Sequence, residues 1–229
     1  MKRRSVWLLM VLALVALLAA CGGDDDASKS PVKGDEVFRA AFDEPGTWEV
    51  GTRTDENGDP LSSLAVVDGR YQIDHAAARS SSFVWGAGDE TVENAIIEVD
   101  VEQLSAEKDN LYGVACRLAA DERGDTSGYA LLLSGDGHYG IAEIRSQSLS
   151  FLLEWHQSDV IKRGAASNTI RAVCVDDYFA VYANGEFLGE ITDDTYRRAG
   201  QVGLVAGVTA EAGVSVAFDD LVVVQGTLE

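Results

Sequence analysis

Three carboxylates recur at every second position between residues 98 and 102, as Glu98, Asp100 and Glu102. Residues two apart on a β-strand share a face, so this spacing would place all three carboxylates together. A pair of carboxylates, one acting as acid/base and one as nucleophile, is the machinery of glycoside hydrolysis. A retaining pair stands about 5–5.5 Å apart, whereas the strand separates Glu98 from Glu102 by about 13 Å, so their side chains would have to converge.

The alternative for this segment is a solvated strand face in a very acidic protein. Residues 93–103 simply alternate apolar and acidic side chains, and no tryptophan or glycine cluster leads into them. We therefore prefer this alternative, and we expect the protein to bind a ligand without catalysis.

Carbohydrate binding is the second chemistry that the residue types allow. Sugar rings pack their C–H faces on aromatic rings, while their hydroxyls need planar polar partners. A core position is the alternative for Trp155, which alternates with Phe151 and Leu153, and a cross-strand ion-pair ladder is the alternative for the polar residues. The candidate ligand contacts are Arg117, Tyr129, Tyr139, Glu143 and Trp155, with Trp85 a further aromatic of the right type.

A calcium site is a third hypothesis, and no other cofactor is expected. Asp43 follows the first expected strand and Asp219 lies in the last, so pairing of the terminal strands would bring hard oxygen ligands together. The alternative is that these aspartates bind backbone amides of turns. The three histidines, His75, His138 and His156, lack a mutual spacing that indicates a metal site or a triad.

The N-terminus has the pattern of an export signal. Basic residues at positions 2–4 precede an unbroken apolar run over residues 6–18, which is too short to span a bilayer comfortably. The sequence Leu-Ala-Ala-Cys that ends at Cys21 resembles the bacterial lipobox. That resemblance implies cleavage after residue 20, acylation of Cys21, and a protein anchored in the bilayer on the extracytoplasmic side of the cell membrane.

Residues 21–34 are small, polar and acidic without apolar periodicity, and we interpret them as a flexible tether before a domain over residues 35–229. Removing residues 1–20 takes away three of the 18 basic residues and none of the 38 acidic ones, which leaves a net charge of −23. Such a field disfavours nucleic acid and anionic lipid headgroups as partners. Neutral glycans and cations remain open.

Two cysteines, Cys116 and Cys174, remain after the lipobox cysteine, each within an apolar strand pattern. Export delivers them to a compartment that permits oxidation, so we predict a disulfide between them. Two buried free thiols are the alternative, because sequence cannot show whether the Cα atoms come within bridging distance.

Strand patterns recur along the whole domain, and no segment sustains helical periodicity for three turns, which predicts an all-β fold. One helical turn is expected at residues 193–198. The central stretch 110–144 reads as a three-stranded meander. Further strands are expected at residues 36–42, 64–67, 70–75, 82–85, 95–103, 150–157, 169–175, 178–183, 186–192, 201–208 and 214–224, with hairpin turns at Asp68-Gly69 and Asn184-Gly185.

The order of these motifs resembles the concanavalin-A-like lectin and glucanase jelly rolls, especially the laminin-G-like and keto-disaccharide-hydrolase-like bacterial domains. The resemblance spans residues 36–225. It implies a β-sandwich of two curved antiparallel sheets, with a concave face that many relatives use for carbohydrate. The residues that carry it are Tyr112-Gly113-Val114, Cys116-Arg117, Gly128-Tyr129, Gly135-Asp136-Gly137-His138-Tyr139-Gly140-Ile141, Asn168-Thr169-Ile170-Arg171, Val181-Tyr182-Ala183-Asn184-Gly185, Gly200-Gln201-Val202-Gly203-Leu204 and Phe218-Asp219-Asp220-Leu221.

These observations predict a lipid-anchored jelly roll that binds a glycan or a cell-surface partner without catalysis. The main alternative is a glycoside-processing hydrolase that uses Glu98, Asp100 and Glu102, which match the E-x-D-x-E form of jelly-roll glucanases. A purely structural envelope protein is a third interpretation. An open groove lined by aromatic and polar side chains would favour binding, and convergent carboxylates in it would favour hydrolysis.

Overall fold

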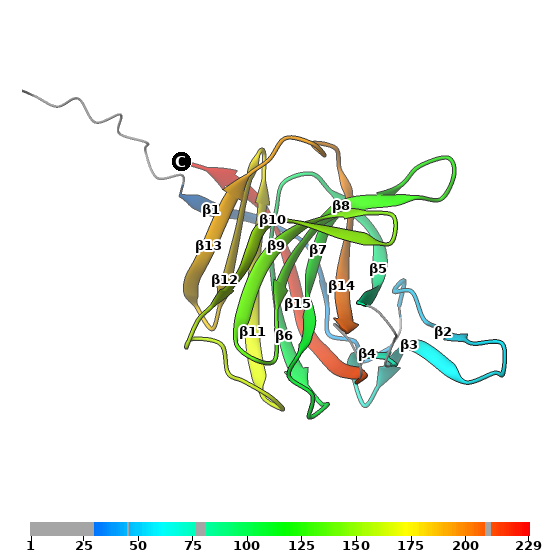
Figure 1. Cartoon of the computed structure of the whole chain (residues 1–229). Helices are drawn as coiled ribbons and strands as arrows, with labels where there is room; N and C mark the ends of the chain where they lie inside the picture. Colours follow the sequence, from blue (N-terminus) through cyan, green and yellow to red (C-terminus); the bar gives the residue numbers. More distant parts are fainter. Residues whose placement is uncertain (1–29, 45, 77–80, 209–211) are drawn as a thin grey trace, which may run out of the picture.

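The structure is a computed structural model that describes residues 30–44, 46–76, 81–208 and 212–229. Within these ranges the chain forms strands β1 to β15 in two antiparallel sheets and contains no helix (Figure 1). The described residues therefore also hold no helix with the length and apolar character needed to cross a bilayer. The predicted all-β class and the antiparallel sandwich are confirmed.

The larger sheet has nine strands, and its longest strand, β15, has three neighbours. β6 pairs along β15, while β4 pairs with the first part of β15 and β1 with the second part, so the two terminal strands pair as expected. In order across the sheet its strands are β13 (Glu186–Thr192), β12 (Tyr178–Ala183), β11 (Ser167–Val175), β6 (Ala95–Gln103), β15 (Val214–Leu228), β4 (Arg70–His75), β3 (Pro60–Val67) and β2 (Gly51–Thr54), with β1 (Pro31–Ala40) beside β15.

The smaller sheet has six strands and contains the predicted meander. Figure 1 shows its strands β8, β9 and β10 lying in front of β11, β12 and β13 of the larger sheet, and both sheets are curved. In order across the sheet its strands are β10 (Ser148–Gln157), β9 (His138–Arg145), β8 (Thr126–Leu133), β7 (Asn110–Ala120), β14 (Gly200–Val208) and β5 (Ser82–Val92).

The main core lies between the sheets and follows the alternation of the strands. On β6, for example, Ile97, Val99 and Val101 are buried in this core, which leaves the intervening residues on the outward face of the larger sheet. A second apolar cluster lies on the opposite, outward face of the smaller sheet and includes Ala115, Ala130 and Ala142. The smaller sheet is therefore apolar on both faces, which is unusual for a sheet with one face toward water.

The predicted disulfide is confirmed. Cys116 on β7 and Cys174 on β11 are bonded across the core, with their Cα atoms 6.7 Å apart. Each cysteine belongs to a different sheet, so the bridge ties the two layers of the sandwich together.

The structure differs from the sequence prediction in several places, of which three matter here. β1 begins at Pro31, so residues 31–34 belong to the sheet and not to the tether. β2 was not predicted, because its sequence Gly-Thr-Arg-Thr has no apolar alternation and all four residues are exposed. The helical turn at residues 193–198 was wrong: the Asp193 carboxylate accepts the backbone N–H of Thr195 at 2.9 Å, which favours a side-chain turn over a helix.

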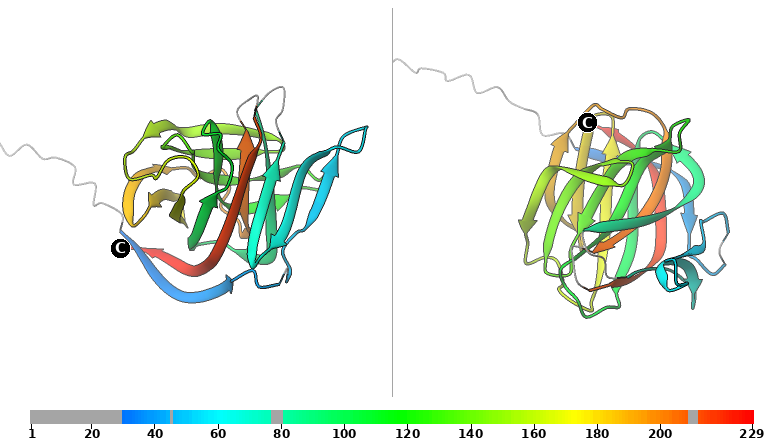
Figure 2. Two further views of the ribbon diagram at one scale, coloured as in Figure 1. Left: turned by 90° about the horizontal axis from the view of Figure 1, so that it is seen from below. Right: turned by 45° about the vertical axis from the view of Figure 1, so that its right-hand side comes forward.

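The β2–β3 hairpin projects from the body of the sandwich beside β4, as Figures 1 and 2 show. Its tip is fixed by Asp55, whose Oδ1 accepts the backbone N–H groups of Asn57 at 2.8 Å and Asp59 at 2.9 Å. The hairpin therefore forms an ordered arm at the end of the larger sheet, on the side where β5 ends the smaller sheet.

Candidate functional site

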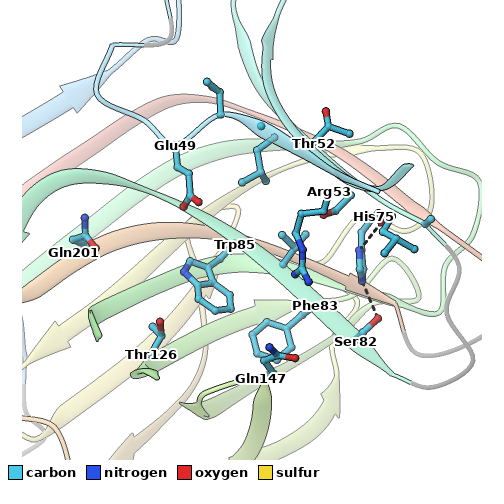
Figure 3. Close-up of a pocket in the computed structure, with 17 residues that line it drawn as sticks. Glu49, Thr52, Arg53, His75, Ser82, Phe83, Trp85, Thr126, Gln147 and Gln201 are labelled. Atoms are coloured by element: carbon cyan, nitrogen blue, oxygen red, sulfur yellow. Dashed lines mark hydrogen bonds between the residues drawn. The ribbon is translucent and has the colours of Figure 1, made fainter. Parts of the chain in front are cut away.

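A pocket of about 860 Å³ lies between the β2–β3 arm and strand β5. This volume is within the range of small-molecule sites in proteins. We call it the edge pocket, and the lining side chains that matter below are Glu49, Arg53, His75, Ser82, Phe83, Trp85, Thr126, Gln147 and Gln201, all labelled in Figure 3.

Two aromatic side chains of β5 form one wall of the edge pocket. Phe83 and Trp85 are both partly exposed, and their ring centroids are 5.7 Å apart. The intervening Val84 belongs to the main core, so the period of two along β5 turns both rings to the outward side. Partly exposed aromatic pairs of this kind offer flat apolar surface to a ligand.

The segment that precedes β2 is held by two hydrogen bonds, one to β5 and one to β4. The backbone N–H of Glu49 donates to the carbonyl of Ala87 at 3.0 Å, and the hydroxyl of Tyr71 donates to the carbonyl of Glu49 at 2.5 Å. A Cβ atom at Gly86 would lie only 1.8 Å from the Tyr71 hydroxyl, so glycine is required there for Tyr71 to reach this segment. These contacts fix one rim of the edge pocket.

Polar side chains surround the aromatic wall. Gln201 donates from Nε2 to the carbonyl of Gly88 at 2.9 Å, which holds its amide in place and leaves its carbonyl oxygen to accept. Gln147 is exposed in the turn between β9 and β10, and Thr126 begins β8. Arg53 is exposed, and within the described ranges its guanidinium has no ion pair. These are the hydrogen-bonding groups that a sugar requires beside an aromatic platform.

A histidine and a serine meet at one end of the edge pocket. Nε2 of His75 lies 2.8 Å from Oγ of Ser82, and Nδ1 lies 3.1 Å from the carbonyl oxygen of Leu61 (Figure 3). Burial lowers the pKa of His75 below its ordinary value of 6.5; the hydrogen bond to Leu61 opposes this shift, and the nearby charge of Arg53 reinforces it. His75 is therefore neutral at neutral pH.

The centre of the smaller sheet's outward face is closed by its own side chains. Ala115, Ala130 and Ala142 are completely buried although they point away from the main core. Phe151 covers part of this surface, since a Cβ atom at Gly140 would lie 3.1 Å from its ring. The central strands are therefore covered on this face, and the edge pocket lies beside the β5 edge of the sheet.

Trp155 and Tyr139, two predicted ligand contacts, lie away from the edge pocket. Trp155 packs on the outward cluster with its ring 5.1 Å from that of Phe151, on β10 at the opposite edge of the sheet from β5. The sequence predicted that Leu153 shares this face, which was wrong. Bulges on both sides of Leu153 turn its side chain to the main core. Tyr139 packs against the main core near His156.

Arg117 and Tyr129 are buried and form hydrogen bonds with other residues of the chain. Arg117 is 1% exposed and donates to the carbonyls of Glu93 and Tyr196 and to Asn94 Oδ1, at 3.0, 2.9 and 3.2 Å. A bulge between Cys116 and Ala119 gives Arg117 a φ of 55° and directs it there. The buried Tyr129 donates its hydroxyl to Asp193.

Glu143, the remaining predicted contact, forms an ion pair with Arg145 at 2.8 Å, and its side chain is nearly buried. Both residues are on β9, so the pair lies within one strand and is not the cross-strand ladder considered for the polar residues of the central strands. None of the five predicted ligand contacts thus lines the edge pocket, whereas Trp85, the further aromatic candidate, does.

The three alternating carboxylates lie on the outward face of the larger sheet, away from the smaller sheet and its pocket. Glu98 binds Lys33 and Arg171, Glu102 binds Arg70, and Asp100 accepts from Thr169 at 2.6 Å. Burial raises the pKa of Glu98, but hydrogen bonds and charges of Lys33 and Arg171 outweigh it and hold the pKa below its usual value. A carboxylate held ionised by two cations is poorly suited to act as a general acid.

The two aspartates of the calcium hypothesis line different hollows. Asp43 borders a hollow with Phe42 and Trp48, whereas Asp219 borders another with Asp100 and Glu102. Asp219 accepts the backbone N–H of Asp220 at 2.8 Å, inside strand β15 and not in a turn. The described residues contain no group of three or more His, Cys, Asp or Glu side chains that could hold a metal ion. The calcium site stays a prediction.

Comparison with solved structures identifies the fold. A protein of unknown function with a galectin-like fold from Bacillus subtilis aligns with a TM-score of 0.64 at 13% identity, over 86% of this chain and 99% of the other. The β-glucanase of Bacillus licheniformis aligns at 0.58 with 7% identity, over 82% and 97% of the two chains. The fold is a concanavalin-A-like jelly roll.

A third jelly roll of similar extent is the carbohydrate-binding module CBM66 from Bacillus subtilis, with a TM-score of 0.55, 11% identity, and coverage of 79% of this chain and 96% of the module. These likenesses confirm the fold that the motifs implied. No protein-family model matches the chain, and no curated protein sequence matches it either.

Sequence reasoning missed most of the edge pocket of this jelly roll. Phe83 and Trp85 stood in a predicted strand, and their spacing of two was a usable sign that both rings share a face. Arg53, Gln147 and Gln201 gave no such sign, because they reach the pocket from three separate elements.

Proposed function

We propose that this protein is a lipid-anchored extracytoplasmic jelly roll that binds a neutral glycan in the edge pocket. The observation that carries the proposal is the pairing of two partly exposed aromatic rings, Phe83 and Trp85, with amide, hydroxyl and charged groups around a hollow of about 860 Å³. A hollow of this size suits a short saccharide and not a long polymer lying across the sheet.

The charge of the chain supports a neutral ligand. The mature chain would carry a net charge of −23, which repels polyanions. The structural likeness to a carbohydrate-binding module and to glucanases is consistent with a glycan but shows only the fold. Cleavage of the glycosidic bond is not part of the proposal, because the candidate carboxylates are occupied by cations on the other sheet.

Glycan-array screening of the full chain in detergent, followed by calorimetry with the best binder, tests the pocket. Trp85→Ala should weaken binding by at least about 30-fold, the cost of a central aromatic anchor. The matched control is Phe187→Ala, which removes an exposed ring of β13 outside the pocket and should leave affinity unchanged. Equal affinities for wild type and Trp85→Ala, with both proteins folded, would overturn the proposal.

The membrane anchor is tested separately, because Cys21 lies outside the described residues. Cys21→Ser should prevent lipidation, since a hydroxyl cannot supply the thioether, and should leave the protein released or its signal uncleaved. Mass spectrometry of the mature amino terminus measures this directly. An unmodified terminus on a wild-type protein that is already soluble would contradict the anchor.

A further inference from the structure

The histidine and serine at the end of the edge pocket form a pair whose roles are set by their partners. The carbonyl of Leu61 can only accept, so the Nδ1 atom of His75 must carry the proton that is donated to it. The other ring nitrogen, Nε2, is then unprotonated and accepts the hydroxyl proton of Ser82 over 2.8 Å. This is the arrangement in which histidine acts as base toward a serine nucleophile, with a carbonyl in place of the usual orienting carboxylate.

The protonation state of His75 suits that role. Its partial burial disfavours the imidazolium form, and the charge of Arg53 on β2 acts in the same direction. Glu49 is the acidic group among the pocket residues that could oppose them, and the segments of β3 and β5 that line the pocket are uncharged. The base is therefore in its active, neutral form at neutral pH.

The position of the pair relates it to the proposed ligand. Ser82 directly precedes Phe83 on β5, so its side chain leaves the strand on the face opposite the two rings, yet Ser82 and both rings line the same pocket. Figure 3 shows Arg53 between the His75–Ser82 pair and the two rings, where its guanidinium faces the interior of the pocket. A substituent on a bound sugar would meet a nucleophile, its base and a positive charge together.

We propose that Ser82 and His75 hydrolyse an acyl ester on a hydroxyl group of the glycan that Phe83 and Trp85 hold. This inference rests on the proposed glycan-binding function and adds a reaction to it. The substrate class is a sugar bearing a short O-acyl group, because the hollow must hold both the ring and the ester.

The reaction balances with water as the only co-reactant. Ser82 Oγ attacks the ester carbonyl carbon while His75 Nε2 takes its proton, and Arg53 stabilises the negative charge that develops on the carbonyl oxygen. The bond from carbon to the sugar oxygen breaks, and His75 returns the proton to that oxygen. Water, deprotonated by His75, then attacks the acyl carbon; the bond from that carbon to Ser82 Oγ breaks, His75 returns the proton to Oγ, and the acyl group leaves as a carboxylic acid.

The experiment treats the full chain in detergent with a fluorophosphonate probe, maps the labelled peptide by mass spectrometry, and follows hydrolysis of p-nitrophenyl acetate. We expect label on Ser82, loss of turnover in Ser82→Ala, and a fall of at least about 100-fold in His75→Gln. The matched control Ser150→Ala changes an exposed serine on β10 and should behave as wild type. The wild-type rate should rise with pH and level off with a midpoint below 6.5, the ordinary pKa of histidine.

Absence of label on wild-type Ser82, or turnover that survives Ser82→Ala, would overturn the esterase. If the glycan still binds with a dependence on Trp85, the proposed function stands and the His75–Ser82 hydrogen bond only joins the end of β4 to the start of β5. If Ser82 is labelled and turns over ester but no glycan binds, the reaction stands and the proposed ligand is wrong.

Discussion

The outward face of the larger sheet and the edge pocket contain similar residue types in opposite situations. On the larger sheet, Glu98 and Glu102 are each held by cations from other strands of the same sheet, so that charged groups satisfy one another. In the edge pocket, Arg53 has no ion pair within the described part of the chain and stands beside partly exposed aromatic rings. Polar groups that are already paired stabilise a surface, whereas groups left open beside apolar area are available to a ligand.

The same contrast explains why the alternating carboxylates of β6 are a poor guide to chemistry. Alternating carboxylates are conspicuous in a sequence, yet on a sheet they meet whatever the nearby strands present, here Arg171 and Thr169 on the adjacent β11 and Arg70 on β4, beyond β15. Which cations lie opposite depends on strand order, and strand order is not visible in a local pattern.

The largest expected effect comes from the bond that joins the two sheets. Replacing both Cys116 and Cys174 with alanine should lower the free energy of unfolding by up to about 4 kcal/mol, because the loop they close is long. Neither cysteine lines the edge pocket, so affinity for the glycan at low temperature should not change. Thermal unfolding with and without reductant measures the first quantity, and calorimetry measures the second.

A single Cys116→Ala variant sharpens this prediction. It leaves Cys174 as a free thiol that can pair between molecules, so it should be less stable against aggregation than the double variant. An unchanged melting temperature on reduction would contradict the stabilising effect predicted for the disulfide. A loss of glycan affinity without unfolding would contradict the prediction that the disulfide does not affect the pocket.

Much of the sandwich could be predicted because its strands obey a period of two. The segments 70–75, 95–103, 178–183 and 186–192 match β4, β6, β12 and β13 end to end. The Asn184-Gly185 turn is also as expected, with φ of 52° and 88°, the pair of positive values that a tight hairpin needs.

The parts that failed are those where the period of two is interrupted or where distant elements meet. A bulge turned Arg117 inward, and two bulges separated Leu153 from Trp155, so residues assigned to one face belong to two. The edge pocket joins the β2–β3 arm to β5, and β2 has no apolar pattern to predict it. Local spacing could identify Phe83 and Trp85 as neighbours but could not identify what faces them.

A smaller effect is expected on the outward face of the larger sheet. Glu98→Gln removes the charge that Lys33 and Arg171 share, and it should cost about 1 kcal/mol or less, since the group is partly solvated. Glycan affinity should be unchanged because Glu98 lies outside the edge pocket. A large loss of glycan affinity in this variant would contradict the claim that the outward face of the larger sheet does not bind the ligand.

The difference in the free energy of unfolding between wild type and Glu98→Gln should depend on pH in one direction. The pKa of Glu98 is lower in the folded protein than its ordinary 4.5, so its ionised form stabilises the fold at higher pH. The difference in stability between wild type and Glu98→Gln should be complete near neutral pH and should disappear as the pH falls below 4.5 and through the folded pKa. Denaturant titrations of both proteins between neutral and acid pH measure it.

The most direct test of the central claim is a crystal structure of the protein with the glycan selected by the array. We expect a sugar ring packed on Phe83 or Trp85, with its hydroxyls bound by pocket groups such as Gln147 or Gln201. A sugar bound instead in the hollow of about 250 Å³ beside Asp100 and Glu102 on the larger sheet would contradict it.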